Sequence, residues 1–185
     1  MGGALREVNI LIEGYTDEAI VKRLLGHVGL SAGNVYGRQG RQYILSNLIK
    51  YNSAAEQSPW VVVVDLDHDE CAPALVKAAL PNRCDQLCLR VAVRAVEAWL
   101  LGDAESLSEY LGVSPVLVPK TPDTLPDPKL ALVNLARKSR RRAVREDIVP
   151  RPNSGAVVGP GYASRIVEFA GSRWRPDIAE ISSDS

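Results

Sequence analysis

Two apolar segments that each run into an acidic cluster constrain the fold of this chain more than any other feature. Residues 8–12 are followed by the sequence Glu-Gly-Tyr-Thr-Asp, and residues 60–64, a Trp and four Val, are followed by Asp-Leu-Asp. Short apolar runs rich in β-branched residues predict strands that are buried on both faces, as in a parallel sheet. If the two strands are neighbours, their carboxyl ends bring the acidic side chains together at one edge of that sheet.

The rest of the first half alternates between helical and strand patterns. Helical spacing of apolar residues begins after Thr16, which we expect to cap the first helix. Further helices are expected around residues 44–49 and 74–80, and further strands at 34–36 and 87–93. This alternation predicts an α/β fold, a Rossmann-like, mainly parallel four-stranded sheet flanked by helices.

The second half has a mostly helical pattern. Helices are expected at residues 95–101, 104–111, 129–145 and 162–170, with a proline-rich loop at 115–128. Asp103 is expected to cap the helix that follows it. We therefore expect an α/β core at 1–103 and a helical, loop-rich C-terminal extension at 104–185, packed on the core.

The charge of the chain is balanced in sum and uneven in distribution. The 22 basic and 22 acidic residues give a formal net charge of zero, which argues neither for nor against a nucleic-acid partner. Basic residues gather between Arg137 and Arg151, where they would suit phosphate binding or form an ordinary solvated helix face.

Segments that would direct the chain to a membrane are not expected. No apolar stretch approaches the length of a bilayer span, and the N-terminus lacks the apolar core of a signal peptide. The three cysteines fit reduced thiols. These features predict a cytoplasmic protein with no membrane partner.

The acidic residues after the two strands are typical of a metal site. Glu13, Asp65 and Asp67 would lie at one sheet edge, and Asp65 and Asp67, two residues apart, would point to the same side. Carboxylates within about 5 Å of each other need a cation or raised pKa values. Oxygen-only ligands favour Mg²⁺ or Mn²⁺. Glu97, in an apolar run, could pair with Arg94 or reach a metal.

Each residue also has an ordinary structural interpretation. Glu13 could be a solvated strand end, Asp17 a helix-dipole residue and Asp65 the cap of a turn. The sequence from Gly37 to Arg41 contains Arg38 and Arg41, which could contact phosphate or belong to a plain turn.

A zinc site is a third reading. His68, Cys71, Cys84 and Cys88 have spacings near those of zinc ligands. We expect instead a surface histidine and three buried thiols.

The ordered acidic motifs resemble those of TOPRIM domains, which occur in topoisomerases, bacterial primases, small ribosomal-RNA maturases and OLD-family nucleases. The matching residues are Glu13-Gly14-Tyr15-Thr16-Asp17 and Asp65-Leu66-Asp67, and the resemblance covers about residues 7 to 103. It implies a TOPRIM-like fold and metal-dependent phosphodiester chemistry. In it, Glu13 would be the catalytic glutamate, Asp65 and Asp67 the metal-binding carboxylates, and Asp17 and Glu97 additional ligands.

A downstream segment is similar to one in small prokaryotic proteins related to the OLD TOPRIM domain. It reads Glu-Ala-Trp-Leu-Leu-Gly-Asp from Glu97 to Asp103, and Asp127-Pro128-Lys129 follows. Members often carry a late lysine near a tyrosine, where this chain has Tyr162 and Arg165.

The predicted function is that of a small Mg²⁺- or Mn²⁺-dependent nuclease, acting on DNA or RNA in a defence or mobile-element system. The chain has no room for topoisomerase or primase domains and no Gly-x-x-x-x-Gly-Lys-Ser/Thr loop, so any ATPase would be a separate subunit.

A second copy of the chain, in a homodimer, is the other protein partner that we consider. The alternative is a non-catalytic TOPRIM-like binding module. The residues expected to contact nucleic acid are Arg38, Arg41, Arg140, Arg141, Arg142 and Arg165.

Overall fold

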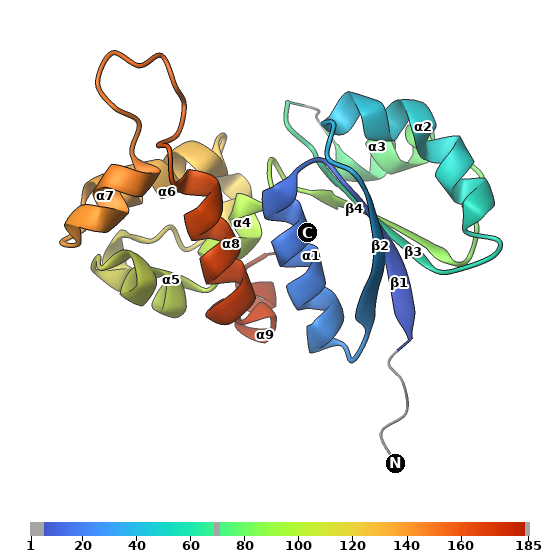
Figure 1. Ribbon diagram of the computed structural model, residues 1–185, viewed down its shortest axis with the longest axis horizontal. Coiled ribbons are helices and arrows are strands. Elements are labelled where there is room, and N and C mark those ends of the chain that lie inside the picture. Colours follow the sequence, from blue (N-terminus) through green and yellow to red (C-terminus); the bar gives the residue numbers. More distant parts are fainter. Residues whose placement is uncertain (1–5, 69–70, 184–185) are drawn as a thin grey trace. The chain divides into compact units, whose positions relative to one another are not determined.

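The computed structural model describes residues 6–68 and 71–183, and the chain divides into two compact units (Figure 1). The first unit ends at Val93 and the second begins at Arg94. The sequence placed the boundary after residue 103, so the segment that carries Glu97 and Asp103 lies in the second unit. Among the described residues, no helix is long and apolar enough to cross a bilayer.

The first unit is built on a four-stranded sheet. Its strands are β1 (Glu7–Ile12), β2 (Ser31–Gly37), β3 (Trp60–Asp65) and β4 (Leu87–Ala92), in the spatial order β2-β1-β3-β4. Every neighbouring pair is parallel. The predicted α/β architecture with a parallel sheet flanked by helices is therefore confirmed.

The helices of this unit cover both faces of the sheet. Helix α1 (Tyr15–His27) lies on one face, and α2 (Arg41–Ala54) and α3 (Ala72–Ala79) lie on the other (Figure 1). The connection from β1 to β2 runs in one direction across the sheet, and the connections to β3 and β4 run in the opposite direction. Right-handed crossovers then require helices on opposite faces. The reversal leaves a topological switch point between β1 and β3.

Apolar side chains of the central strands are buried on both faces of the sheet. Leu11, Val62 and Val64 belong to one core cluster with Ile44 and Leu48 of α2. The flanking residues of β1, Ile10 and Ile12, point to the other face and are also fully buried. This two-sided burial explains why the β3 sequence is a continuous valine run rather than an alternating pattern.

The second unit is helical and loop-rich. Its helices are α4 (Glu97–Gly102), α5 (Ala104–Leu111), α6 (Pro128–Arg137), α7 (Arg142–Ile148), α8 (Tyr162–Ser172) and α9 (Pro176–Ala179), with 3₁₀ turns at Pro115–Leu117, Pro122–Thr124 and Glu180–Ser182. Leu100, Leu132, Phe169 and Trp174 are among its most deeply buried side chains.

The single helix expected at residues 129–145 is wrong, because α6 ends at Arg137 and α7 begins at Arg142. The break is organised by the buried Ser139, whose hydroxyl donates a hydrogen bond to the carbonyl of Leu111. The same oxygen accepts one from the backbone N–H of Arg141 at 3.0 Å. A serine that bonds the local backbone offers the chain an alternative to helix.

The two predicted helix caps have different outcomes. Thr16 does not cap α1, because the helix begins one residue earlier and Gly14 is its N-cap. The side chain of Asp17 accepts a hydrogen bond from the Gly14 N–H at 2.8 Å, which is the reciprocal half of a capping box. Asp103 caps α5 as predicted, since its carboxylate accepts from the Ser106 N–H at 3.3 Å.

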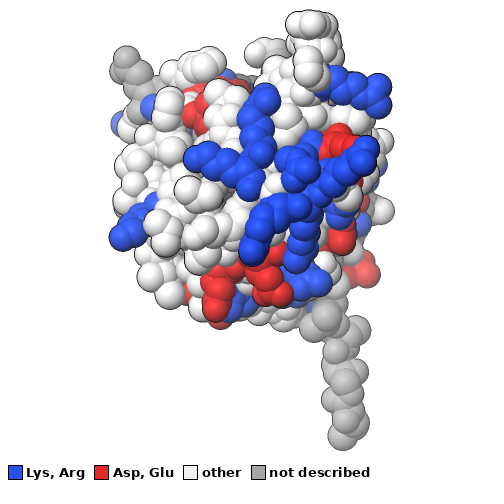
Figure 2. All heavy atoms as spheres, turned by 90° about the vertical axis from the view of Figure 1, so that its left-hand side faces the viewer, with Lys and Arg blue, Asp and Glu red and all other residues white. Residues whose placement is uncertain are grey.

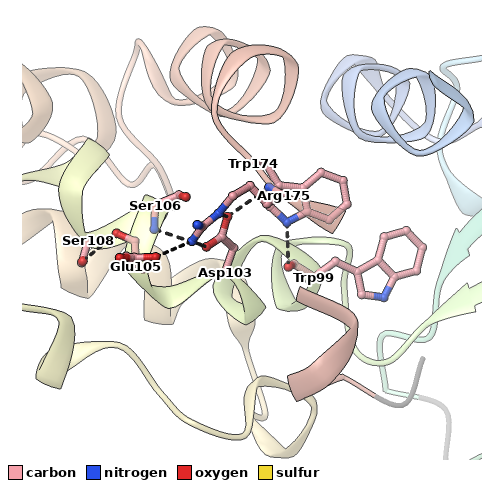
Figure 3. Close-up of polar contacts among 7 residues, drawn as sticks. All are labelled: Trp99, Asp103, Glu105, Ser106, Ser108, Trp174 and Arg175. Carbon is pink, nitrogen blue, oxygen red and sulfur yellow. Dashed lines mark hydrogen bonds and ion pairs between the residues drawn. The ribbon is translucent and has the colours of Figure 1, made fainter. Parts of the chain in front are cut away.

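Asp103 also forms the main buried ion pair of the second unit (Figure 3). Its oxygens lie 2.7 Å and 3.0 Å from two side-chain nitrogens of Arg175. Burial alone would raise the pKa of Asp103, but hydrogen bonds from Arg175 and Ser106 hold it below its usual value. The neighbouring Trp174 donates through its indole N–H to the carbonyl of Trp99 at 3.2 Å, which joins the segment before α9 to α4.

Replacing Asp103 by Ala should lower the free energy of unfolding by roughly 2–4 kcal/mol, because the Arg175 guanidinium and the N-terminus of α5 both lose their carboxylate. Urea denaturation measures the change. The matched control is Glu105→Ala, since Glu105 also contacts Arg175, at 2.8 Å, but its side chain is 80% exposed. That change should cost less than about 1 kcal/mol. Equal losses in the two variants would contradict this account of Asp103.

Candidate functional site

The carboxyl ends of β1 and β3 are joined by a side-chain contact. Glu13 follows β1 directly, and Asp65 is the last residue of β3. The two strands are neighbours in the sheet, and the Glu13 carboxylate accepts a hydrogen bond from the backbone N–H of Asp65 at 2.8 Å. The predicted approach of these two residues at one sheet edge is therefore present, and it falls at the topological switch point, where open α/β sheets bind ligands.

The loop after β2 lies against the same edge. The backbone N–H of Arg38 donates to the carbonyl of Ile12 at 2.8 Å, and that of Gly40 donates to the carbonyl of Glu13 at 3.1 Å. Gly37 has a φ of 89°, and a Cβ there would lie 2.2 Å from the Ile12 carbonyl oxygen. Only glycine allows this approach, so the glycines of this segment place the loop beside Glu13.

The two arginines of this loop have different surroundings. The guanidinium of Arg38 is bound to Glu18, with its Nε 3.0 Å from the carboxylate, and lies over the ring of Tyr15 at 4.9 Å from the centroid. Arg41 faces the acidic edge instead, with one nitrogen 4.0 Å from a carboxylate oxygen of Asp67. Of the two, Arg41 is therefore the one placed to meet an anion bound at this edge.

Asp17 and Asp67 occupy contrasting environments. Asp17 is buried and its carboxylate is engaged by the backbone of Gly14 and by the Thr16 hydroxyl, at 2.8 Å and 3.2 Å. The Asp67 side chain is half exposed, and its backbone has a positive φ of 52°, a conformation that aspartate adopts more readily than most residues other than glycine. Asp17 therefore holds the loop in shape, and Asp67 presents its carboxylate to solvent.

Electrostatic coupling links these acids to Glu13. Burial raises the pKa of Glu13 to about 7, the hydrogen bond from Asp65 opposes the rise, and the negative charges of Asp17 and Asp67 add to it. Arg41 lowers this pKa only in part. The two negative charges thus favour the protonated form of Glu13, and a cation bound beside them would favour its ionised form.

The side chains described at this edge that could bind a metal ion are carboxylates. Within residues 6–68 and 71–183, no three His, Cys, Asp or Glu side chains form a ready-made metal cluster, while Asp69 of the acidic run lies outside the described residues. Mg²⁺ rarely uses an all-protein cage and is usually held by one or two carboxylates, water and substrate phosphate. Two carboxylates at this sheet edge, those of Asp65 and Asp67, would suit that mode of binding.

The zinc reading gains no support from the geometry. His68, Cys71, Cys84 and Cys88 are all described, and they are not part of any three-residue metal group in the described chain. Cys71 is exposed, so the expectation of three buried thiols is wrong for this residue, while Cys84 and Cys88 are partly buried.

Glu97 lies in the second unit, where three segments of the downstream motif meet. It is 2% exposed, and one carboxylate oxygen accepts a hydrogen bond from the Tyr162 hydroxyl at 2.8 Å. The same oxygen lies 3.6 Å from the ammonium of Lys129, which belongs to the Asp-Pro-Lys segment. The second oxygen is buried and accepts no hydrogen bond from the described residues. The role of Glu97 as a metal ligand stays a prediction.

The contacts of Glu97 with Lys129 and Tyr162 were not predicted from the sequence. The sequence offered one signal, the position of Glu97 within an apolar run. A carboxylate that is buried there needs a hydrogen-bond donor or a cation as its partner. The identity of the partners depends on how α6 and α8 pack against α4, which no local pattern specifies.

Most of the arginines that were expected to contact nucleic acid instead form hydrogen bonds or ion pairs within their own unit. Arg141 donates to the carbonyl of Tyr110 at 3.0 Å, Arg142 pairs with Glu146 at 2.7 Å, and Arg165 pairs with Asp147 at 2.8 Å. Arg140 is exposed and lines a shallow hollow with Lys138. The structure therefore gives Arg141, Arg142 and Arg165 local partners and leaves other cations to face solvent.

Comparisons with protein-family models, with curated proteins and with solved structures found no match to this chain.

The pKa of Glu13 predicts a pH-dependent stability that Glu13→Gln should remove. Between pH 4.5 and 7 the unfolded chain releases the proton while the folded chain keeps it, so this group's contribution to stability falls as pH rises through that window. Relative to wild type, the Gln variant should therefore gain on the order of 1–2 kcal/mol between pH 5 and pH 8. Urea titrations in EDTA measure this gain. The control is Glu56→Gln at an exposed position, and a flat difference between Glu13→Gln and wild type would contradict the prediction.

Proposed function

We propose that the first unit is a TOPRIM-like domain that hydrolyses phosphodiester bonds of nucleic acid with a divalent metal. The observation that carries the proposal is the contact of Glu13 with Asp65 at the switch point between β1 and β3. The resemblance of the Glu-Gly and Asp-x-Asp motifs to TOPRIM domains supplies the reaction class.

Each acidic residue has a separate part in this proposal. Asp65 and Asp67 would hold the cation, and Asp17, from the same unit, is a further candidate ligand. A bound Mg²⁺ or Mn²⁺ supplies stabilisation of charge on the phosphoryl group and activation of water. Glu13, with its pKa raised to about 7, is partly deprotonated at neutral pH and accepts a proton from the attacking water.

Arg41 is the residue that we propose to orient the scissile phosphate. It is partly buried, it lies 4.0 Å from Asp67, and it is the cation that lowers the Glu13 pKa. A guanidinium at this position can bind two phosphate oxygens at once. Arg38 is held by Glu18 and Tyr15 and shapes the loop.

A non-catalytic metal-binding module is the second candidate function. It is favoured by the engagement of Asp17 in the helix cap and by the absence of a three-residue metal group within the described ranges. On this view the domain serves in a complex. The resemblance of the motifs to those of OLD proteins suggests a separate ATPase chain as the partner, in a defence or mobile-element system.

Hydrolysis of labelled single- and double-stranded DNA and RNA in Mn²⁺ tests the catalytic proposal. Glu13→Gln should lower the rate by about 10²- to 10⁴-fold, because the proton acceptor is lost while the hydrogen-bond acceptor for Asp65 is kept. Asp65→Asn should abolish turnover. Asp85→Asn, at an exposed position of the same unit, is the matched control and should leave the rate unchanged.

The outcomes separate the two candidate functions. Turnover by wild type that persists in both Glu13→Gln and Asp65→Asn would contradict the proposed site. Wild-type protein that binds Mn²⁺ and cleaves none of the four substrates would favour the non-catalytic module.

A further inference from the structure

The region from Arg137 to Arg151 concentrates positive charge in the second unit. Its fifteen residues contain seven Lys or Arg and two acidic residues, a net charge of +5 in a chain whose total is zero. Figure 2 shows Lys and Arg side chains gathered on the face that looks out from the side where Figure 1 labels α7. Some Asp and Glu side chains also lie on this face, but an excess of positive charge on one face favours an anionic partner.

Part of this face is hollowed. A depression of about 690 Å³ is lined by Arg137 at the end of α6, Arg145 on α7 and Arg151 in the loop after it. Two acidic residues, Glu146 and Asp147, also line it. The charge that the depression presents therefore depends on which cations these two acids neutralise.

The acidic residues are paired with arginines outside the lining. Glu146 binds Arg142 at 2.7 Å, and Asp147 binds Arg165 at 2.8 Å. Among the described residues, Arg137, Arg145 and Arg151 make no ion pair within 4 Å. The depression thus keeps three guanidinium charges for a ligand.

The base of the depression is held in place by the break between α6 and α7. The guanidinium of Arg145 donates to the carbonyl of Ser139. Ser139 is itself buried and bonded to Leu111. The guanidinium of Arg145 is therefore already held against the backbone, which lowers the entropic cost of ordering this side chain on binding.

We infer that this depression binds the phosphate backbone of nucleic acid through Arg137, Arg145 and Arg151. The inference rests on the proposed function, because both assume nucleic acid as the ligand. It replaces Arg141, Arg142 and Arg165, which were expected from the sequence to contact nucleic acid. Guanidinium groups suit phosphate oxygens, and the lining contains no aromatic side chain for stacking on bases. Binding is therefore independent of sequence and strongly dependent on salt.

Fluorescence anisotropy of the full chain with labelled duplex DNA and single-stranded RNA tests the inference, in EDTA so that no hydrolysis occurs. The double variant Arg137→Gln, Arg151→Gln removes two exposed guanidinium groups. Its affinity should fall about tenfold or more, and the slope of log affinity against log salt should fall by about 2. The control Lys77→Gln, Arg83→Gln removes the same charge from exposed positions of the first unit and should bind as wild type does.

Other results would overturn the inference. They are unchanged affinity and salt slope in the Arg137, Arg151 variant, equal losses in the control, or binding only to vesicles of anionic phospholipid.

The results of this test can be told apart from those that test the proposed function. If these arginines bind nucleic acid in a salt-dependent way but the protein shows no Mn²⁺-dependent cleavage, only the nuclease proposal is contradicted. If the protein cleaves nucleic acid and the double variant binds as tightly as wild type, only this inference is contradicted.

Discussion

The hydrogen bond from the backbone N–H of Asp65 to the Glu13 carboxylate joins the ends of the two central strands, and the candidate site depends on it. It is possible only because β1 and β3 are adjacent, which follows from the order β2-β1-β3-β4. Burial at this junction raises the pKa of Glu13 to about 7, and Asp17 and Asp67 add negative charge. One topological feature thus produces both the position and the acidity of the proposed general base.

Buried carboxylates are satisfied differently in the second unit. Asp103 receives a two-point contact from Arg175 and a backbone donor from α5, so its charge is fully partnered. Glu97 has Tyr162 and Lys129 at one oxygen, and its other oxygen is buried without a donor from the described residues. Asp103 therefore has the environment of a structural residue, whereas Glu97 keeps the unmet bonding capacity expected of a functional one.

Prediction from sequence succeeded where the signal was local and periodic, and failed where a distant contact decided the structure. The valine run of β3 and the acidic residues after it predicted a buried parallel strand and the meeting of Glu13 with Asp65. The break after Arg137 was missed because it depends on Ser139 bonding to Leu111, which is distant in the sequence. The charge run likewise identified a basic region. Which arginines remain for a ligand is known only from the structure, where Glu146 pairs with Arg142 and Asp147 pairs with Arg165.

The most direct test of the central claim is calorimetric titration of the metal-free protein with Mn²⁺, in wild type and in Asp65→Asn and Asp67→Asn. If the switch-point carboxylates hold the cation, wild type binds with a defined stoichiometry and both variants lose most of the affinity while remaining folded. A folded wild type that binds no Mn²⁺, or variants that bind it as tightly as wild type, would contradict the claim.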